Sequence, residues 1–256
     1  MGIGHYTETD VKESARAWTG WTLHDYRSYV DRRIFTFKPL LHDAGSKVFL
    51  GQTGPWDGTD VMRIVLAHPA APPWIAGKLA RFFVSPHPDP DLVEAMAEAL
   101  SSTGYEVGPV LRAVFRSRAF YRPDVMYAQV KSPVQFLVGA VRHLGISHPD
   151  WPRLAQAAME MGQRLFFPPT VAGWPGDTAW INAGTVFARV DAAARLVAGS
   201  LGSPDLSFDS VGDLTARLLG RPLSPARGVV LGGLAARGVT PEVVHLVLSL
   251  PEYQVA

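Results

Sequence analysis

The sequence contains 256 residues, of which 47% are hydrophobic and 18% charged, a composition typical of a globular protein with a sizeable core. The formal net charge is +1, and the arginines, among them Arg63, Arg112 and Arg189, form no stripe, so nucleic acid is disfavoured as a partner. The chain has no cysteine, which excludes disulfides and thiolate metal sites.

Helix-start signals recur along the chain. A capping oxygen satisfies a free backbone N–H group of the first turn, and proline lacks the N–H that the first helical position leaves unpaired. Thr7, with Asp10 three residues later, resembles a capping box, and Asp150 is expected to cap a further helix. The capping residues that come directly before a proline are Asp89, Ser132, Ser224 and Thr240.

Apolar side chains follow helical spacing after these starts. In 133–145, Val134, Leu137 and Leu144 belong to one stripe that recurs every three or four residues, the period of a helix face. The predicted helices, in chain order, are 8–19, 59–67, 70–84, 90–102, 107–117, 133–145, 151–164, 183–199, 207–219, 225–237 and 241–249.

One segment departs from the helical pattern. Residues 33–38 alternate apolar and polar side chains, as a half-buried strand does, and residues 47–50 are short and apolar. Pro39 and the turn at 43–45 suit a loop between them, so we predict one two-stranded hairpin within 33–50. Because an isolated hairpin is only marginally stable, we expect it to lie against the helices.

A second irregular stretch, residues 167–182, is rich in proline, glycine and tryptophan. Its prolines and glycines preclude both a helix and a central strand. Leaving Phe166, Phe167 and Trp174 in water would forfeit about 1.5–3 kcal/mol for each side chain. We therefore expect this loop to pack on the helices.

Together these elements predict a mainly α fold, an irregular multi-helix bundle with one small two-stranded β-hairpin. Residues 1–200 would form the main helical domain, which carries the hairpin and the Pro-rich loop 167–182. The stretch 200–206 reads as the best linker. Residues 201–256 would then form a C-terminal three-helix piece that packs on the main domain.

The sequence shows no membrane or export signal. No apolar stretch approaches the roughly 20 residues that are needed to span a bilayer. Residues 1–8 have neither the basic start nor the apolar run of a secretory signal peptide. We therefore predict no transmembrane segment and no signal peptide in this chain.

The turn 42–47 carries the sharpest polar cluster. The imidazole of His42, the carboxylate of Asp43 and the ammonium of Lys47 could surround one ligand, with Asp43 orienting His42 as a base. The alternative is structural: Asp43 caps a turn, Gly45 supplies a positive φ angle and Lys47 is solvated.

Trp174, Trp180 and Asn182 form a second cluster. Two indoles and an amide could stack on a sugar ring and bond its hydroxyls. Alternatively, both tryptophans hold the loop to the core and Asn182 caps the helix that begins at residue 183.

Lys131 is a further candidate, because it stands at the amino end of a predicted helix. The helix dipole disfavours a free cation there. A partner carboxylate or a bound anion would explain Lys131, and so would a simple surface position.

Motifs of the common enzyme classes are missing. The chain has no Gly-x-Ser-x-Gly elbow, no Walker phosphate loop, no dinucleotide glycine fingerprint and no His-Glu-x-x-His zinc helix. Its eight histidines are spread along the sequence, so we predict no metal site and no cofactor.

Several phrases, taken together and in order, resemble one family. They include Tyr-Thr-Glu-Thr-Asp-Val at 6–11, Ala-Trp-Thr-Gly-Trp at 17–21, His-Asp-Ala-Gly-Ser-Lys at 42–47, Leu-Ala-His-Pro at 66–69, Lys-Ser-Pro at 131–133 and Gly-Trp-Pro-Gly at 173–176. Over roughly residues 4–200 the chain resembles the carboxy-terminal half of the bacterial domain of unknown function 1800 (DUF1800) family.

The resemblance implies a setting as well as a fold. Members usually carry a preceding helical half with an Asn-Glu-Asn-aromatic-Ala-Arg-Glu run, which this sequence lacks, so the chain would be a fragment or begin at an internal methionine. Members are commonly exported and often encoded beside a sulfatase-like protein. The resemblance therefore implies a periplasmic or secreted location and a sulfatase-like partner.

We expect a non-catalytic helical module of an exported system, which binds a protein partner or a glycan through the loops 39–58 and 167–182. The alternative is a hydrolase or transferase whose site joins His42, Asp43 and Lys47 to an amino-terminal half. The sequence leaves open which of the two classes applies, because function depends on the site and not on the fold.

Overall fold

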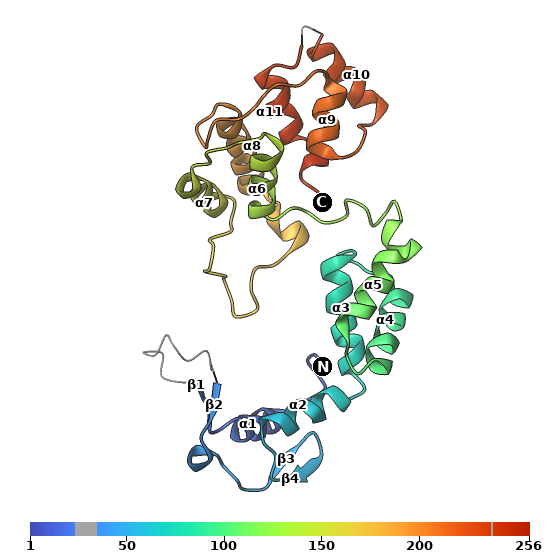
Figure 1. The fold of residues 1–256 in the computed structure, drawn as a ribbon, viewed down its shortest axis with the longest axis vertical. Helices are drawn as coiled ribbons and strands as arrows, with labels where there is room; N and C mark the ends of the chain where they lie inside the picture. The colour runs from blue at the N-terminus through green and yellow to red at the C-terminus, as the bar shows by residue number, and fades with distance from the viewer. Residues whose placement is uncertain (24–34, 237) are drawn as a thin grey trace. The chain divides into compact units, whose positions relative to one another are not determined.

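The computed structural model describes residues 1–23, 35–236 and 238–256. These residues form eleven α-helices and two small antiparallel sheets of two strands each (Figure 1), so the predicted mainly α fold is confirmed. Within them, no helix combines the length and the apolar character that crossing a membrane requires. The chain divides into two compact units, residues 1–120 (unit 1) and residues 121–256 (unit 2).

Unit 1 contains the first five helices and both sheets. Its elements are α1 (Glu8–Ala17), β1 (Trp21–Leu23), β2 (Phe35–Phe37), the 3-10 turn η1 (Pro39–Leu41), β3 (Lys47–Phe49), β4 (Gln52–Gly54), α2 (Gly58–Ala67), α3 (Ala71–Phe83), α4 (Pro90–Ser102) and α5 (Val107–Arg116), followed by η2 (Arg118–Tyr121) at the boundary.

The strands pair differently from the prediction. β2 pairs with β1, and β3 pairs with β4, both antiparallel. The segment 33–38 therefore does not form a hairpin with the segment 47–50, although residues 33 and 34 themselves lie outside the described residues. Alternation identifies a strand but carries no information about its partner.

A tight turn explains the pairing of β3 with β4. Leu50 and Gly51 have φ angles of +47° and +75°, and two successive residues with positive φ form the hairpin turn whose twist matches that of the strands. Gly51 adopts this conformation readily because it has no Cβ atom. Phe49 consequently pairs with Gln52, directly across the turn.

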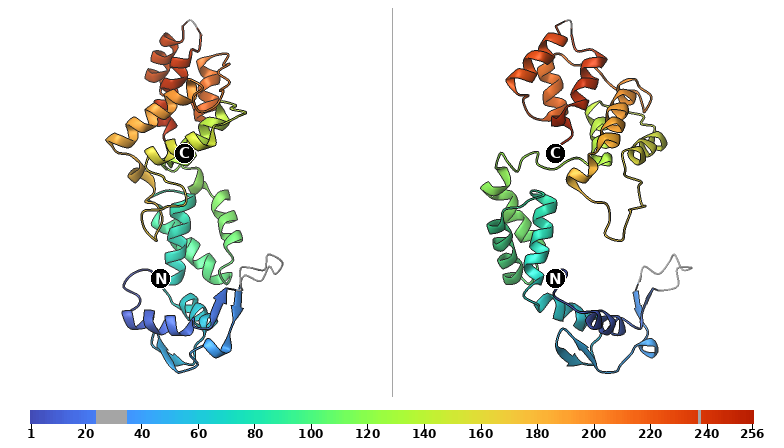
Figure 2. Two further views of the ribbon diagram at one scale, coloured as in Figure 1. Left: turned by 90° about the vertical axis from the view of Figure 1, so that its left-hand side faces the viewer. Right: turned by 180° about the vertical axis from the view of Figure 1, so that it is seen from behind.

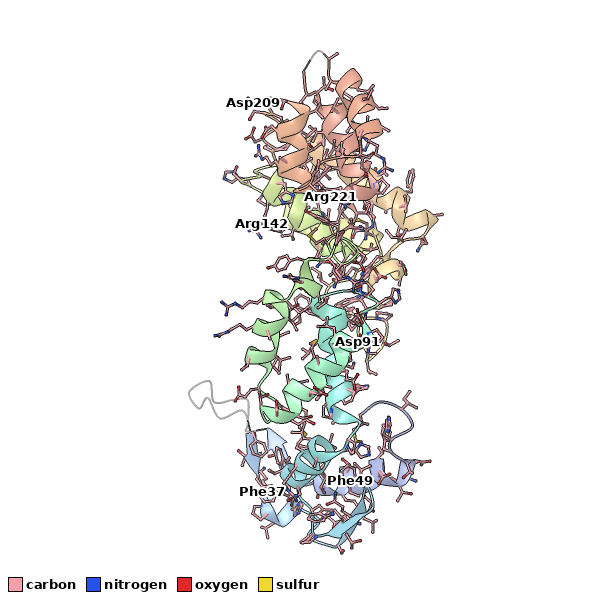
Figure 3. The ribbon with its side chains drawn as sticks, turned by 90° about the vertical axis from the view of Figure 1, so that its right-hand side faces the viewer. Phe37, Phe49, Asp91, Arg142, Asp209 and Arg221 are labelled. Atoms are coloured by element: carbon pink, nitrogen blue, oxygen red, sulfur yellow. The ribbon has the colours of Figure 1, made fainter. Side chains whose placement is uncertain are left out.

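The core of unit 1 beside this hairpin is small. Buried Phe49 from β3 packs with Ala17 of α1 and with Val61 and Ile64 of α2. Figure 3 labels Phe49 in this part of the molecule. This packing fixes β3, and with it the turn 42–47, against α1.

Unit 2 contains the remaining six helices among the described residues; Figure 2 draws this unit in green to red. Its elements are α6 (Pro133–His143), α7 (Trp151–Glu160), η3 (Asp177–Trp180), α8 (Ala183–Val197), α9 (Val211–Leu219), α10 (Pro225–Leu234), α11 (Pro241–Ser249) and η4 (Pro251–Tyr253).

One hydrophobic cluster joins the helices of unit 2. It includes Leu137 of α6, Leu196 of α8, Leu214 of α9, Leu231 of α10 and Val247 of α11. The last three helices therefore share their core with the helices before them. The predicted division into domains at residue 200 stays a prediction.

Most of the predicted caps are present. Thr7 and Ser132 form capping boxes, and the Asp150 side chain accepts from the backbone of the first turn of α7. Ser224 and Thr240 precede helices as predicted but make no side-chain capping bond. The prolines that follow them already fix the first helical φ angle, so α10 and α11 begin without the hydroxyl bond.

Candidate functional site

The turn 42–47 in unit 1 is held by Arg16 of α1. Arg16 Nε lies 2.7 Å from Asp43 Oδ2, and Arg16 Nη2 lies 3.3 Å from Asp43 Oδ1. The Gly45 N–H donates to the same Oδ1 atom at 2.9 Å. The hydrogen bonds from Arg16, and then that from Gly45, lower the pKa of Asp43 to about 2. Asp43 is thus a carboxylate with partners on both oxygens.

Lys47 stabilises the same turn through its buried side chain. Its side chain is only 1% exposed, and Nζ donates to the carbonyl oxygens of Asp43 at 2.5 Å and of Gly45 at 3.0 Å. The expectation of a solvated Lys47 is wrong, because α1 packs on β3 and covers the start of that strand. The buried ammonium instead satisfies two carbonyl groups of the turn.

Gly45 and His42 complete this picture. Gly45 does not have the expected positive φ angle; a Cβ atom there would lie 3.0 Å from Arg16 Nη2 and from Asp43 Oδ1. A side chain at this position would therefore crowd the ion pair. His42 Nδ1 lies 3.0 Å from the Thr19 carbonyl oxygen, and among the described residues no hydrogen bond joins it to the Asp43 carboxylate. A ligand-binding role for these residues stays a prediction.

The second predicted cluster lies in unit 2, around η3 and the start of α8. Trp180 is buried and Trp174 is half-buried. Asn182 caps α8: its Oδ1 accepts from the Thr185 N–H at 3.0 Å, and its own N–H donates to Thr185 Oγ1 at 2.9 Å. The capping alternative for Asn182 is confirmed. A sugar-binding role for this cluster stays a prediction.

The loop between α7 and η3 runs out from the helices of unit 2 (Figure 2), and two of its aromatic side chains are exposed. Phe166 is 90% exposed and Phe167 is 62% exposed, while Val171 is fully exposed. The expectation of packing on the helices is therefore wrong for Phe166 and Phe167, whereas Trp174 is half-buried. The loop instead closes on itself through a backbone bridge between Thr170 and Gly173. We call residues 165–171 the apolar loop.

Lys131, the last predicted candidate, is half-buried in unit 2. Its Nζ atom donates to the Tyr253 carbonyl oxygen at 2.8 Å and lies 4.0 Å from the centre of the Tyr253 ring. Burial, followed by the charges of Arg221 and Arg189, lowers the pKa of Lys131 to about 8. A carbonyl group and a ring hold this cation, rather than the carboxylate that we considered.

Next to Lys131 lies Arg189 of α8, whose side chain is only 2% exposed. Nη2 donates to the Lys131 carbonyl oxygen at 2.7 Å and Nη1 donates to Gln254 Oε1 at 3.2 Å. Burial lowers the pKa of Arg189 to about 10. Arg189 also lines a cavity of about 300 Å³.

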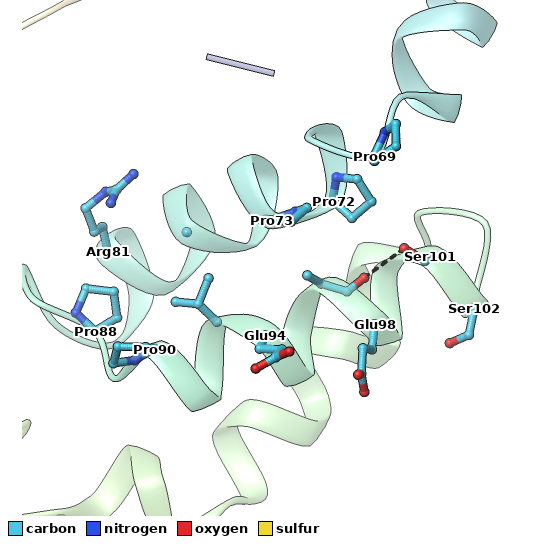
Figure 4. A pocket seen from close by; sticks show the side chains of 13 residues that line it. Pro69, Pro72, Pro73, Arg81, Pro88, Pro90, Glu94, Glu98, Ser101 and Ser102 are labelled. Atoms are coloured by element: carbon cyan, nitrogen blue, oxygen red, sulfur yellow. Dashed lines mark hydrogen bonds between the residues drawn. The ribbon is translucent and has the colours of Figure 1, made fainter. Parts of the chain in front are cut away.

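A groove of about 1070 Å³ lies between α3 and α4 in unit 1 (Figure 4). Small residues, Gly77 of α3 and Ala97 of α4, line it together with prolines, and Figure 4 shows Glu94 and Glu98 projecting from α4. The prolines that line it are Pro69, Pro72, Pro73, Pro88 and Pro90. The sequence identified Pro90 as the start of a helix. It did not predict the groove, because the groove forms only where α3 and α4 pack together.

A polar recess of about 440 Å³ lies at the start of α1 in unit 1. The rings of His5 and His68 meet there edge to face, with centroids 5.7 Å apart. His68 Nδ1 accepts from the Ala70 N–H at 3.1 Å. Over the residues that the structure describes, no group of three or more His, Asp or Glu side chains is arranged to hold a metal ion.

Comparison with known proteins decides the family. The model of the family described as "Protein of unknown function (DUF1800)" matches residues 1–255. The chain belongs to the DUF1800 family. Curated proteins and solved structures yield no match to it. Because the family description assigns no activity, the function of the DUF1800 chain has to be argued from its own side chains.

Sequence reasoning located part of the site chemistry of the DUF1800 chain. It grouped His42, Asp43 and Lys47, of which Lys47 bonds the Asp43 carbonyl oxygen, but it missed Arg16, the partner of the Asp43 carboxylate, because Arg16 lies on α1, far from the turn in sequence. It counted Arg189 among scattered arginines. Arg189 is buried beside Lys131, Gln254 and the Phe136 ring, and spacing within one helix does not show such contacts.

The pKa of Lys131 predicts how the stability of the DUF1800 chain depends on pH. The pKa falls from 10.5 to about 8 on folding, so the unfolded chain holds this proton more tightly and losing it favours the folded state. Below the folded value both states are protonated and the penalty remains. We therefore expect the free energy of unfolding to rise between about pH 8 and pH 10.

The variant Lys131→Met isolates this effect. Burial raises the pKa of Tyr253 and lowers that of His143, so both groups titrate mainly outside the range from about pH 8 to pH 10. Arg189, with its pKa lowered to about 10, begins to titrate near the upper end of this range. Denaturant unfolding, followed by hydrogen exchange of α6 and α11 amides, measures the dependence. An equal rise of the free energy of unfolding in the wild type and in Lys131→Met would contradict the assignment of the rise to Lys131.

Proposed function

We propose that this chain is a helical binding module that docks a protein partner through its apolar loop. The observation that carries the proposal is the exposure of Phe166 and Phe167 in one short segment. Transfer of such side chains from water into an interface yields about 1.5–3 kcal/mol each. Contiguous exposed apolar surface is the usual mark of an interaction site.

The chemistry of the loop favours a protein over a glycan. Sugar sites combine an aromatic platform with polar groups that bond the sugar hydroxyls. The phenylalanine rings of the loop carry no hydrogen-bonding group, Trp180 is buried, and the Asn182 amide oxygen is used in the cap of α8. An apolar protein surface would complement this loop better.

The family resemblance suggests which partner to test. Members are often encoded beside a sulfatase-like protein, so we take that protein as the partner and an exported bacterial system as the setting. The hydrolase or transferase alternative gains no support from the turn 42–47, where Asp43 is paired with Arg16 and Lys47 is bonded to two carbonyl groups. That alternative stays a prediction.

The test is binding of the purified full chain to the immobilised sulfatase-like protein encoded beside it. We expect the double variant Phe166→Ser, Phe167→Ser to bind at least about tenfold more weakly, because aromatic hot spots contribute about 2 kcal/mol or more. Both side chains are exposed, so the double variant should keep the wild-type melting temperature.

Val229→Ser is the matched control. Val229 lies on α10 in the same unit and is also strongly exposed, so this variant should bind like the wild type. Unchanged binding by the double loop variant, or no binding by the wild type, would contradict the proposal. Binding to a glycan array that Trp174→Ala abolishes would instead support the glycan reading.

A further inference from the structure

A cavity of about 300 Å³ in unit 2 combines apolar walls with one buried charge. This volume lies at the small end of the range for ligand sites. Of the described residues that line the cavity, Arg189 is the only charged one, and Gln254 and Ser249 are the other polar ones. The aliphatic side chains of the wall are Val130, Ile181, Val186, Val190 and Val255.

Neutral acceptors use only part of the Arg189 guanidinium. The group has five N–H donors, of which one on Nη2 bonds the Lys131 carbonyl oxygen and one on Nη1 bonds Gln254 Oε1. The buried Nε atom has no partner, and no carboxylate pairs with Arg189 among the described residues. Buried charges are normally paired, because removing them from water is costly.

The surroundings of Arg189 add positive charge. Arg221 and Arg189 lie close enough to Lys131 for their charges to disfavour its protonated form. Two acids lie in this region with other partners: Glu252 contacts Arg227 through Oε1, and Asp177 Oδ1 accepts from the Val130 N–H at 3.3 Å. A bound anion would therefore offset the repulsion among these cations and complete the bonding of the guanidinium.

We propose that this cavity binds a carboxylate carried on a short apolar chain, with the carboxylate on Arg189 and the chain against the valine side chains. A guanidinium presents two parallel N–H groups that match the two oxygens of a carboxylate. The apolar wall excludes a strongly hydrated anion such as free phosphate, which would lose its water without gaining enough donors. The ligand is thus an apolar monocarboxylate, either a free acid or the carboxyl end of a peptide.

The test is calorimetric titration of the full chain with hexanoate and with hexanol, which share the apolar chain and differ in the charge. We expect hexanoate to bind at least about tenfold more tightly, because hydrogen bonds to charged groups contribute about 1.5–3 kcal/mol. Equal binding of the two probes, or no binding of hexanoate, would overturn the proposal.

Two variants separate the charge from the cavity. Arg189→Met should remove the preference for hexanoate over hexanol. Val186→Trp keeps Arg189 and changes a partly exposed position of α8 that lines the cavity, so it should fold and weaken both probes at least about tenfold by filling the space. Hexanoate binding at the wild-type level in Val186→Trp would overturn the site.

Arg153→Met is the matched control, since Arg153 is a largely exposed arginine of α7 in the same unit; it should bind hexanoate like the wild type. A dipeptide with a free carboxyl end, compared with its amide, identifies the source of the ligand. Tighter binding of the free dipeptide than of hexanoate would assign the site to a peptide end. The reverse order would assign it to a free acid, and either order supports the site.

Discussion

Replacing Lys47 with alanine is expected to lower the free energy of unfolding of unit 1 by about 2–4 kcal/mol, because two charge-assisted hydrogen bonds are lost at a buried site. Lys47 Nζ is the common donor to the carbonyl oxygens of Asp43 and Gly45. Without the ammonium these acceptors lose a buried partner, and the side chain leaves a void beneath α1. Hydrogen exchange of amides in α1, β3 and β4, measured in the full chain, reports the loss.

Lys12→Ala is the control for this variant. Lys12 lies on α1, its side chain is largely exposed, and it pairs with the equally exposed Glu8, so its replacement should change the free energy of unfolding by less than about 0.5 kcal/mol. Equal effects of Lys47→Ala and Lys12→Ala would show that the buried ammonium does not hold the turn. Such a result would instead support the alternative from the sequence, in which Lys47 is solvated.

The helices were the most predictable part of the fold. Their starts carry local chemistry, a capping oxygen or a proline, that acts within one turn. α6 begins at Pro133 and α11 at Pro241, as expected. The ends agree less well: α7 ends at Glu160, where the apolar spacing had suggested 164, because Gly162 turns the chain with a φ angle of +96° and the Gly162 and Gln163 N–H groups bond the last carbonyl groups of the helix.

The strands and the apolar loop were less predictable, since both depend on contacts that local patterns do not contain. The segment 47–49 pairs with the residues that follow it because Leu50 and Gly51 form a turn with positive φ angles. The loop was expected to pack, since exposing Phe166 is unfavourable. That argument shows that such a side chain prefers burial, but it does not show that this chain provides the covering surface.

The chemistry of the candidate sites was predictable only where it is local. The turn 42–47 could be recognised from the sequence because His42, Asp43 and Lys47 lie within six residues. The cavity around Arg189, by contrast, is lined by residues that range from 130 to 255. Its defining property, a buried guanidinium without a carboxylate, arises from the packing of separate helices. A single sequence shows the arginine but neither its burial nor its missing partner.

Phe136→Ala is expected to destabilise unit 2 by about 3–5 kcal/mol, the range for removing a fully buried phenylalanine ring. Phe136 is completely buried on α6, and its ring meets that of Tyr253 edge to face at 5.3 Å. The Arg189 guanidinium lies 5.5 Å from the same ring. The substitution should therefore weaken hexanoate binding as well, because the ring supports the arginine. Denaturant unfolding and calorimetry measure the two effects.

Phe187→Ala provides the contrast, since Phe187 is a phenylalanine on α8 that is 75% exposed. Its removal takes no ring out of the core, so the free energy of unfolding should change by less than about 0.5 kcal/mol. The two variants delete the same side chain and differ only in its surroundings. Equal losses of stability would show that the buried Phe136 ring does not hold α6 against Tyr253. In that case the ring could not be the rigid support that positions Arg189 in the proposed carboxylate site.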